Sequence, residues 1–154
     1  MCKLFRGKKT TENIELYNSF LKHVHIAIPK TKSHPILDES FDRVNNKYFF
    51  GLIEKPNLVL GKPSAYQFGC YDYGTDTITI SGLLKDVSTE ILDYVMYHEL
   101  LHKKHKFINK NGKSYHHTSE FRRKEREFEN SAFIEEELKK IGRKRGLRQL
   151  FDLF

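Results

Sequence analysis

The sequence His-Glu-Leu-Leu-His at residues 98–102 limits how this chain can fold more than any other segment does. It lies late in a run, residues 91–105, whose apolar side chains recur at helical spacing. Residues 88–90, Ser-Thr-Glu, precede this run with the cap residue and the early acidic residue that are typical of a helix start. The pattern therefore predicts a packed helix in which His98 and His102 lie about one turn apart on the same face.

The two histidines and the glutamate beside them form a pattern that is typical of metal sites. Two neutral imidazoles at this spacing can bind one zinc ion, and the carboxylate of Glu99 can accept a proton from a water molecule at the metal. The alternative is a helix whose histidines are only solvated or hydrogen-bonded, but a packed helix is what a metal site needs to hold its ligands still. We therefore expect His98 and His102 to bind Zn²⁺ and Glu99 to be catalytic, although manganese or nickel can also occupy histidine sites.

A zinc site that performs hydrolysis has three protein ligands and keeps one position for water. The candidates for the third ligand are His105, His116, His117 and Glu120. His105 continues the same straight helix and would lie about 10 Å from His98 along the axis, too far for one ion to bind both. Of the other three we favour His117, because it follows a polar stretch that can turn the chain back towards the helix.

Length and charge restrict the class of protein. The chain has 154 residues, which suffice for one domain with a core and not for two ordinary ones. Residues 1–154 are thus predicted to form a single domain, with a basic N-terminal segment at 1–10 and a basic C-terminal tail at 139–154. The formal charge of +7 favours acidic partners, nucleic acid first, although an ordinary lysine-rich surface is the alternative.

The cysteines and the apolar runs predict a location. Cys2 and Cys70 form no C-x-x-C pair, and two isolated thiols fit a reducing interior better than a secreted scaffold. No apolar leader begins the chain, and no apolar run approaches about 18 residues. We expect no membrane association and a cytoplasmic location, at the nucleoid or, in a eukaryote, in the nucleus.

The hydrophobic period changes along the chain from helical to strand-like and back again. Helices are predicted at residues 12–28, 38–50, 91–105 and 118–138. Strands are predicted at residues 57–60, 67–73 and 77–81, the last two as a hairpin. Residues 109–114 are predicted to be a polar loop. The order predicts an α+β fold, with a small antiparallel three-stranded sheet packed against helices and the motif on a central helix.

Residues 46–121 resemble the SprT-like zinc metallopeptidases, the family that includes the DNA–protein crosslink protease Spartan. The blocks that carry the resemblance are residues 46–53, 69–72, 77–81, 92–102 and 117–121. Their order is more specific than any single block. The resemblance implies a zincin-like metalloprotease core with His117, in the last block, as the third zinc ligand. The cysteine zinc ribbon that follows the core in several bacterial members has no counterpart in this sequence.

The favoured function is a zinc-dependent metalloprotease that acts on DNA-associated or DNA-crosslinked proteins, as in DNA repair. Basic residues gather at 3–9, 30–32, 103–113 and 139–148, where DNA could bind. One alternative is a nucleic-acid-binding protein with a structural zinc site and little or no peptidase activity. A further alternative is a zinc hydrolase whose substrate is not a peptide.

Two finer predictions concern the reaction and the C-terminus. Tyr115, His116 and His105 are alternatives for a donor that stabilises the oxyanion, and the sequence does not choose among them. An exposed sheet edge beside the motif helix would hold a peptide by strand addition. Residues 147–154 resemble a sliding-clamp binding peptide, but an apolar tail packed on its own domain is favoured.

Overall fold

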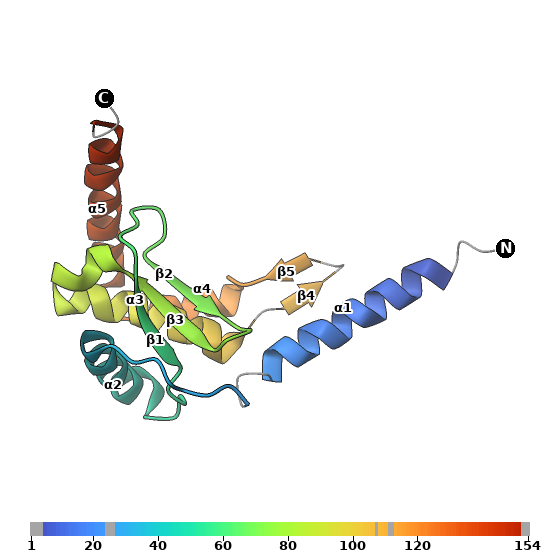
Figure 1. Ribbon diagram of the computed structural model, residues 1–154. Helices are drawn as coiled ribbons and strands as arrows, with labels where there is room; N and C mark the ends of the chain where they lie inside the picture. Colours follow the sequence, from blue (N-terminus) through green and yellow to red (C-terminus); the bar gives the residue numbers. More distant parts are fainter. Residues whose placement is uncertain (1–4, 24–26, 107, 111–112, 152–154) are drawn as a thin grey trace.

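A small sheet and one long helix, α3, form the centre of the structure (Figure 1). This computed structural model describes residues 5–23, 27–106, 108–110 and 113–151, with side-chain environments for 13–21, 23, 27–106 and 115–144. The helices are α1 (Phe5–His23), α2 (Pro35–Phe49), the 3₁₀ helix η2 (Gly82–Asp86), α3 (Thr89–His105), α4 (Ser119–Glu125) and α5 (Ser131–Phe151). The strands are β1 (Asn57–Gly61), β2 (Gly69–Asp72), β3 (Thr77–Ser81), β4 (Ile108–Lys110) and β5 (Lys113–Tyr115). The predicted α+β class is confirmed.

The three-stranded sheet has the order β1-β3-β2 and is mixed. Strands β2 and β3 form the predicted antiparallel hairpin, in which Tyr71 lies opposite Ile78. Strand β1 pairs with β3 in parallel, with Leu58 opposite Ile78, so the prediction of an all-antiparallel sheet is wrong. The chain reverses between β1 and β2 and again before β3, so β3 runs in the direction of β1. Because β3 rather than β2 occupies the middle, β2 is left at one edge of the sheet.

The predicted long helix at residues 118–138 is also wrong, because α4 ends at Glu125 and α5 begins at Ser131. Asn130, between them, has a φ of 57°, in the left-handed region that a right-handed helix cannot contain. Helix α5 then continues through most of the basic tail. The predicted loop at 109–114 lies within a hairpin, since β4 and β5 pair from Ile108 opposite Tyr115. The side chains of the predicted clamp-binding segment, 147–154, lie outside the described residues.

The first two helices match their predictions in kind and differ at the ends. Helix α2 begins at Pro35, whose fixed φ suits a first helical turn, and ends before Phe50, which has a φ of 57°. Helix α1 ends at His23 rather than at residue 28 and extends away from the sheet in Figure 1. Its apolar residues Tyr17 and Phe20 are 61% and 59% exposed. No helix among the described residues is long and apolar enough to span a membrane.

Helix α3 is held on several sides, and this fixes the residues that it carries. It contacts α2, the strands β2 and β3, and the helices α4 and α5. Met96 and Leu100 are fully buried on this helix, as is Phe121 on α4. Each such burial contributes about 1.5–3 kcal/mol relative to exposure. The buried face turns the opposite, polar face of α3 towards a surface cleft.

A buried ionic cluster joins the turn before β3 to the end of α3. Asp76 is fully buried and accepts hydrogen bonds from Nζ of Lys103, at 2.7 Å to each oxygen, from the hydroxyl of Tyr71 at 2.7 Å, and from Lys30. Burial opposes ionisation of Asp76, but the hydrogen bonds from Lys103 and Lys30 hold the pKa of this carboxyl below its usual value. Lys103 directly follows His102, so the cluster anchors the helix end that carries the motif.

Candidate metal centre

The structure brings the three predicted histidine ligands together. His98 and His102 project from one face of α3, and His117 enters from the segment between β5 and α4. The Nε2 atoms of His98 and His102 are 3.1 Å apart, and those of His102 and His117 are 3.2 Å apart. One nitrogen from each residue lies within 4.8 Å of the others. Two residues from a helix and one from a distant loop thus converge on one point.

These spacings fit a tetrahedral zinc ion. With bonds of about 2.0–2.1 Å, tetrahedral geometry places two ligand nitrogens about 3.3–3.4 Å apart. The observed 3.1 and 3.2 Å separations are close to that value. Among the described residues the cluster contains three candidate ligands, which is the number of protein ligands in a hydrolytic zinc site.

The proton positions also favour a cation between the rings. Nδ1 of His98 lies 2.6 Å from Oε1 of Glu125, so this nitrogen donates its proton to the carboxylate. In the neutral ring, Nε2 of His98 then presents a lone pair towards His102. Nε2 of His102 lies 3.1 Å from this atom and 3.2 Å from Nε2 of His117, and with one proton or one lone pair it can form only one hydrogen bond, whereas a cation can bind all three nitrogens. The residues present therefore fit a zinc ion better than a set of mutual hydrogen bonds.

Burial keeps two of the three rings in the neutral form that binds metals. It lowers the pKa of His102 to about 3, with help from the charges of His98 and His117. Burial also lowers the pKa of His117. For His98 burial acts in the same direction and is the largest single effect, but the hydrogen bond to Glu125 and the charges of Glu99 and Glu125 together outweigh it and raise the pKa. The carboxylate that orients His98 thus also makes the ring a stronger base.

Glu99 lies on the same helix with its carboxylate against β2. Its side chain is buried, and burial raises the pKa of Glu99 to about 7, against the charge of His98 and a hydrogen bond from the backbone of Tyr71. Strand β2 approaches this closely because residue 69 is glycine. A Cβ atom there would lie 2.5 Å from Oε1 of Glu99 and 2.9 Å from Cγ1 of Val95. Gly69 therefore makes room for the predicted catalytic residue.

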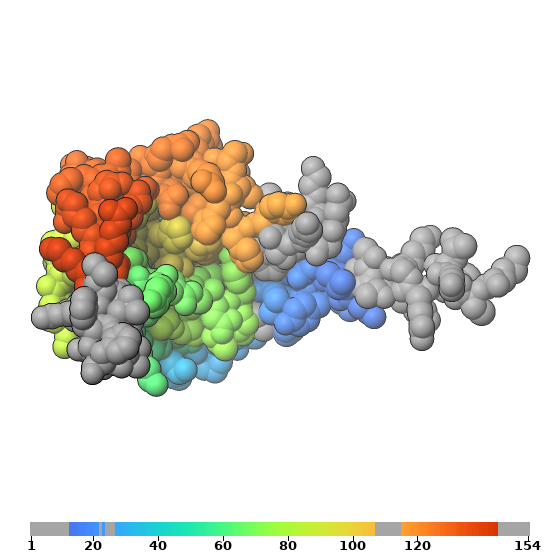
Figure 2. All heavy atoms as spheres, turned by 90° about the horizontal axis from the view of Figure 1, so that it is seen from above, coloured from blue at the N-terminus to red at the C-terminus, as the bar shows by residue number. Residues whose placement is uncertain are grey.

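An open cleft of about 650 Å³ gives access to these groups. Its walls include the three histidines, Glu99 and the strand β2. Figure 2 shows the surface hollowed between the green segment around β2 and the orange segment of α4, with α3 at the floor. The three histidines of the cluster therefore lie on the wall of an open cleft.

The other residues that were candidates for a metal ligand or an oxyanion donor lie in different places in the structure. Tyr115 and His116 line the cleft, whereas His105 and Glu120 do not. The ring of His105 lies 6.4 Å from that of Phe121, and its buried Nε2 has no hydrogen bond. Neither His105 nor Glu120 belongs to the histidine cluster. Of the predicted oxyanion donors, His105 is therefore the least suitable.

Sequence reasoning missed three residues of this site: Glu125, Gly69 and Tyr73. Tyr73 lines the cleft and donates a hydrogen bond of 3.3 Å to the backbone carbonyl of His102. Burial raises the pKa of the Tyr73 hydroxyl, so it stays protonated and able to donate. Residues 69–72 were identified from the sequence only as one of the blocks that resemble the SprT-like family. Nothing in the sequence indicated that Glu125 contacts His98, because a hairpin and a loop separate the two residues in the chain.

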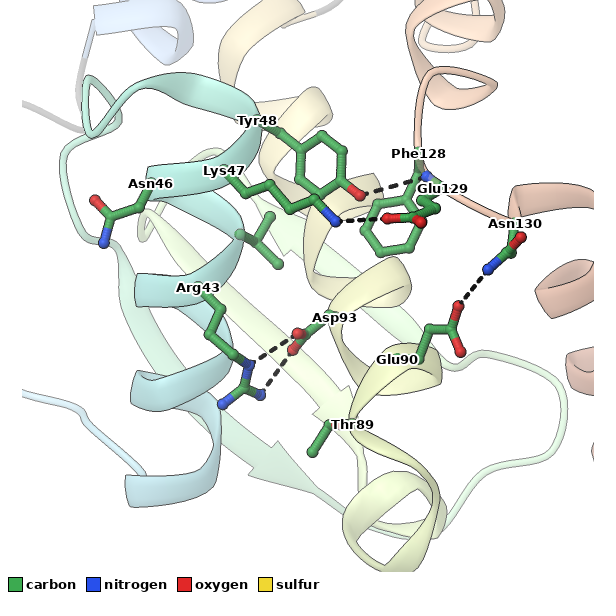
Figure 3. A pocket seen from close by; sticks show the side chains of 11 residues that line it. Arg43, Asn46, Lys47, Tyr48, Thr89, Glu90, Asp93, Phe128, Glu129 and Asn130 are labelled. Atoms are coloured by element: carbon green, nitrogen blue, oxygen red, sulfur yellow. Dashed lines mark hydrogen bonds and ion pairs between the residues drawn. The ribbon is translucent and has the colours of Figure 1, made fainter.

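A second cavity, of about 710 Å³, lies between α2, the start of α3 and the α4–α5 connection (Figure 3). None of the predicted site residues lines it. Four of its charged groups form two ion pairs, Arg43 with Asp93 at 2.8 Å and Lys47 with Glu129 at 2.8 Å, and Glu90 accepts a hydrogen bond of 3.0 Å from Asn130. These pairs join α2 to α3 and to the α4–α5 connection, so the polar groups of this cavity have a structural role.

No protein-family model matches the chain, and no curated protein sequence does so either. The chain is similar in fold to the metallopeptidase zymogen jannalysin of Methanocaldococcus jannaschii, with a TM-score of 0.51 and 24% sequence identity. The superposition covers 75% of this chain and 95% of that crystal structure's chain. At this identity the similarity concerns the fold, which is thus an α+β fold of the kind found in a metallopeptidase.

Proposed function

We propose that this chain is a zinc-dependent metallopeptidase of the SprT-like type. The observation that carries the proposal is the convergence of three histidine nitrogens beside a buried carboxylate in an open cleft. The fold shared with a metallopeptidase zymogen supports it. The three candidate ligands among the described residues favour hydrolysis over a structural zinc site, because structural sites are closed by a fourth protein ligand.

In this mechanism His98, His102 and His117 hold the metal. A zinc ion bound there would lower the pKa of a water molecule and polarise the scissile carbonyl. Glu99 accepts the proton from the attacking water and delivers it to the leaving amine. Burial raises the pKa of Glu99 and so makes its carboxylate a stronger base for this proton.

Strand β2 is the proposed site for the peptide backbone. It forms one edge of the sheet, where an extended peptide can pair by strand addition beside the Tyr71 backbone group that binds Glu99. Its first residue, Gly69, touches Glu99, so a peptide on this edge passes beside the histidine cluster. Tyr115 and His116 line the same cleft and are the remaining candidates for a donor to the oxyanion, since the Tyr73 hydroxyl donates to the backbone carbonyl of His102.

The test is a cleavage assay on an unfolded protein, such as casein, with purified protein before and after chelation. We expect one bound zinc per chain, loss of cleavage when zinc is removed, and recovery when zinc is added. The Glu99→Gln variant should keep its zinc and cleave nothing. Cleavage by this variant at the parental rate would show that Glu99 is not the base. Hydrolysis of small esters or amides without any peptide cleavage would favour the non-peptide alternative.

We also propose that the protein substrates are DNA-bound, on the basis of the SprT-like resemblance and the charge of +7. Two of the basic residues counted for this purpose, Lys30 and Lys103, instead bind the buried Asp76. Lys32 and Lys104 remain exposed. Phosphate contacts predict that the affinity for DNA falls steeply with salt concentration. No binding to DNA at low salt would refute this part of the proposal. The cytoplasmic location and the sliding-clamp contact stay predictions.

A further inference from the structure

A third cavity, of about 440 Å³, adjoins the proposed active site on its other side. It shares Gln67, Gly69, His98 and Glu99 with the cleft described above, so the two cavities meet at the histidine cluster. Its own residues come from the segment before β2, from α3, and from α4 and α5: Tyr66, Phe68, Tyr94, Val95, Glu125, Glu135 and Leu138. A peptide on the edge of β2 therefore has this cavity directly beside the bond to be cleaved.

The walls of this cavity suit a long side chain. Tyr94 and Val95 lie one helical turn before His98 and Glu99, so the cavity extends about 5.4 Å along α3 from the histidine cluster. Tyr66, Phe68 and Leu138 contribute apolar surface. The segment that carries Phe68 rests against α5, because Cζ of Phe68 lies only 3.8 Å from where a Cβ of Gly142 would be.

Three carboxylates, those of Glu99, Glu125 and Glu135, and no lysine or arginine line this cavity among the described residues. Glu125 is occupied by His98, at 2.6 Å. Glu135 accepts a hydrogen bond of 2.9 Å from the Tyr94 hydroxyl and forms no ion pair within the part of the chain that the structure describes. Lys139, one turn further along α5, pairs with Glu136 at 2.6 Å, so among the described residues no lysine or arginine contacts the Glu135 carboxylate.

We propose that this cavity, which we call the α5 pocket, binds a lysine or arginine side chain of the substrate next to the scissile bond. The proposal rests on the peptidase function proposed above. Alternate side chains of an extended peptide point to opposite faces, so one residue flanking the bond directs its side chain towards α3. The methylene groups of that side chain lie along Tyr66 and Phe68, and its cationic group binds Glu135.

The first arm of the test maps cleavage sites in an unfolded protein by mass spectrometry. We expect lysine and arginine to be enriched at one of the two positions flanking the cleaved bonds. A pair of quenched fluorescent peptides that differ only there, with lysine or uncharged norleucine, then gives the ratio of kcat/KM values. In the Glu135→Gln variant this ratio should fall roughly tenfold, as expected for the loss of a hydrogen bond between charged groups. An unchanged ratio would overturn the proposal.

Two further variants separate the charge of Glu135 from its structural contact. Tyr94→Phe removes the hydroxyl that binds Glu135 but keeps the carboxylate, so the preference for lysine should persist. Glu136→Gln makes the same change of charge on an exposed neighbour that pairs with Lys139, and should leave the ratio at the parental value. Loss of the preference in Tyr94→Phe alone, with Glu135→Gln unaffected, would contradict the proposed role of the carboxylate.

A binding arm distinguishes failure of the pocket from failure of the peptidase. The zinc-loaded Glu99→Gln variant is titrated into the lysine and norleucine peptides, and binding is followed by fluorescence anisotropy. We expect roughly tenfold tighter binding of the lysine peptide, and loss of this difference when Glu135→Gln is added. If the parent cleaves nothing, the peptidase proposal fails and the binding ratio still decides the pocket. If the parent cleaves peptides without regard to charge and both peptides bind equally, only the pocket is refuted.

Discussion

The contact between Gly69 and Glu99 gives the sharpest prediction about the proposed active site. In a Gly69→Ala variant the new methyl carbon would lie 2.5 Å from Oε1 and 3.0 Å from Cδ of Glu99, and 2.9 Å from Cγ1 of Val95. Contacts this short cannot be kept, so either the carboxylate or the strand must move. Val95 and Glu99 are both buried on α3, which leaves them little room to retreat.

The expected magnitude follows from the size of that movement. Relief to an ordinary contact of about 3.4–4.0 Å requires a displacement on the order of 1 Å. A misplacement of about 1 Å in a catalytic group costs roughly 100-fold in rate. Overpacking of one methyl group costs about 1–3 kcal/mol of folding free energy, less than the usual stability of a domain. The variant should therefore fold and bind zinc, with kcat lowered roughly 100-fold.

The assay compares kcat, zinc content and the urea midpoint of unfolding in the parent and two variants. Gly74→Ala is the matched control, because its added methyl group would meet only Oδ1 of Asp72, at 3.3 Å, in the turn after β2. We expect kcat near the parental value in the control. Parental kcat in Gly69→Ala would mean that Glu99 does not act from its observed position.

Three other predictions concern the residues around the metal and the buried cluster. Glu125→Gln should weaken zinc binding about 10–100-fold in a chelator competition, because it removes the charge that orients His98; unchanged affinity would deny that role. His117→Ala should reduce zinc affinity far more than His116→Ala does, and equal losses would reassign the third ligand. Asp76→Asn should lower the free energy of unfolding at pH 7 by about 3–5 kcal/mol, since Lys103 stays buried without its counter-charge. Because folding lowers the pKa of Asp76, this stabilisation is complete above the ordinary carboxyl value of 3.8 and is lost as the pH falls through the folded pKa. Urea unfolding of parent and variant should converge at low pH, and a constant difference would count against the ion pair.

The histidine cluster could be predicted because its geometry is local or nearly so. His98 and His102 share a helix whose period is visible in the sequence, and the structure places them as that period requires. His117 was found by its position after a stretch that reverses the chain, and by the resemblance. The carboxylate of Glu99 needed no tertiary information, because it lies beside its histidine in sequence.

Most of the failures concern relations between distant segments. The apolar residues of β1 and β3 do not indicate which strand lies in the middle of the sheet. The parallel pairing of Leu58 with Ile78 could therefore not be inferred from the sequence. The break at Asn130 depends on one left-handed residue, which the apolar spacing on either side conceals. Glu125 is a surface-type residue in sequence, and only the packing of α4 on α3 makes it a partner of His98.

The most direct test of the account is X-ray absorption at the zinc edge on the purified protein. The account predicts one zinc per chain with three imidazole nitrogens at about 2.0–2.1 Å and one oxygen from solvent. His117→Ala should lose one of the nitrogen ligands from this spectrum. A coordination sphere that contains a fourth protein ligand would contradict the central claim. So would a His117→Ala variant whose spectrum is the same as that of the parent.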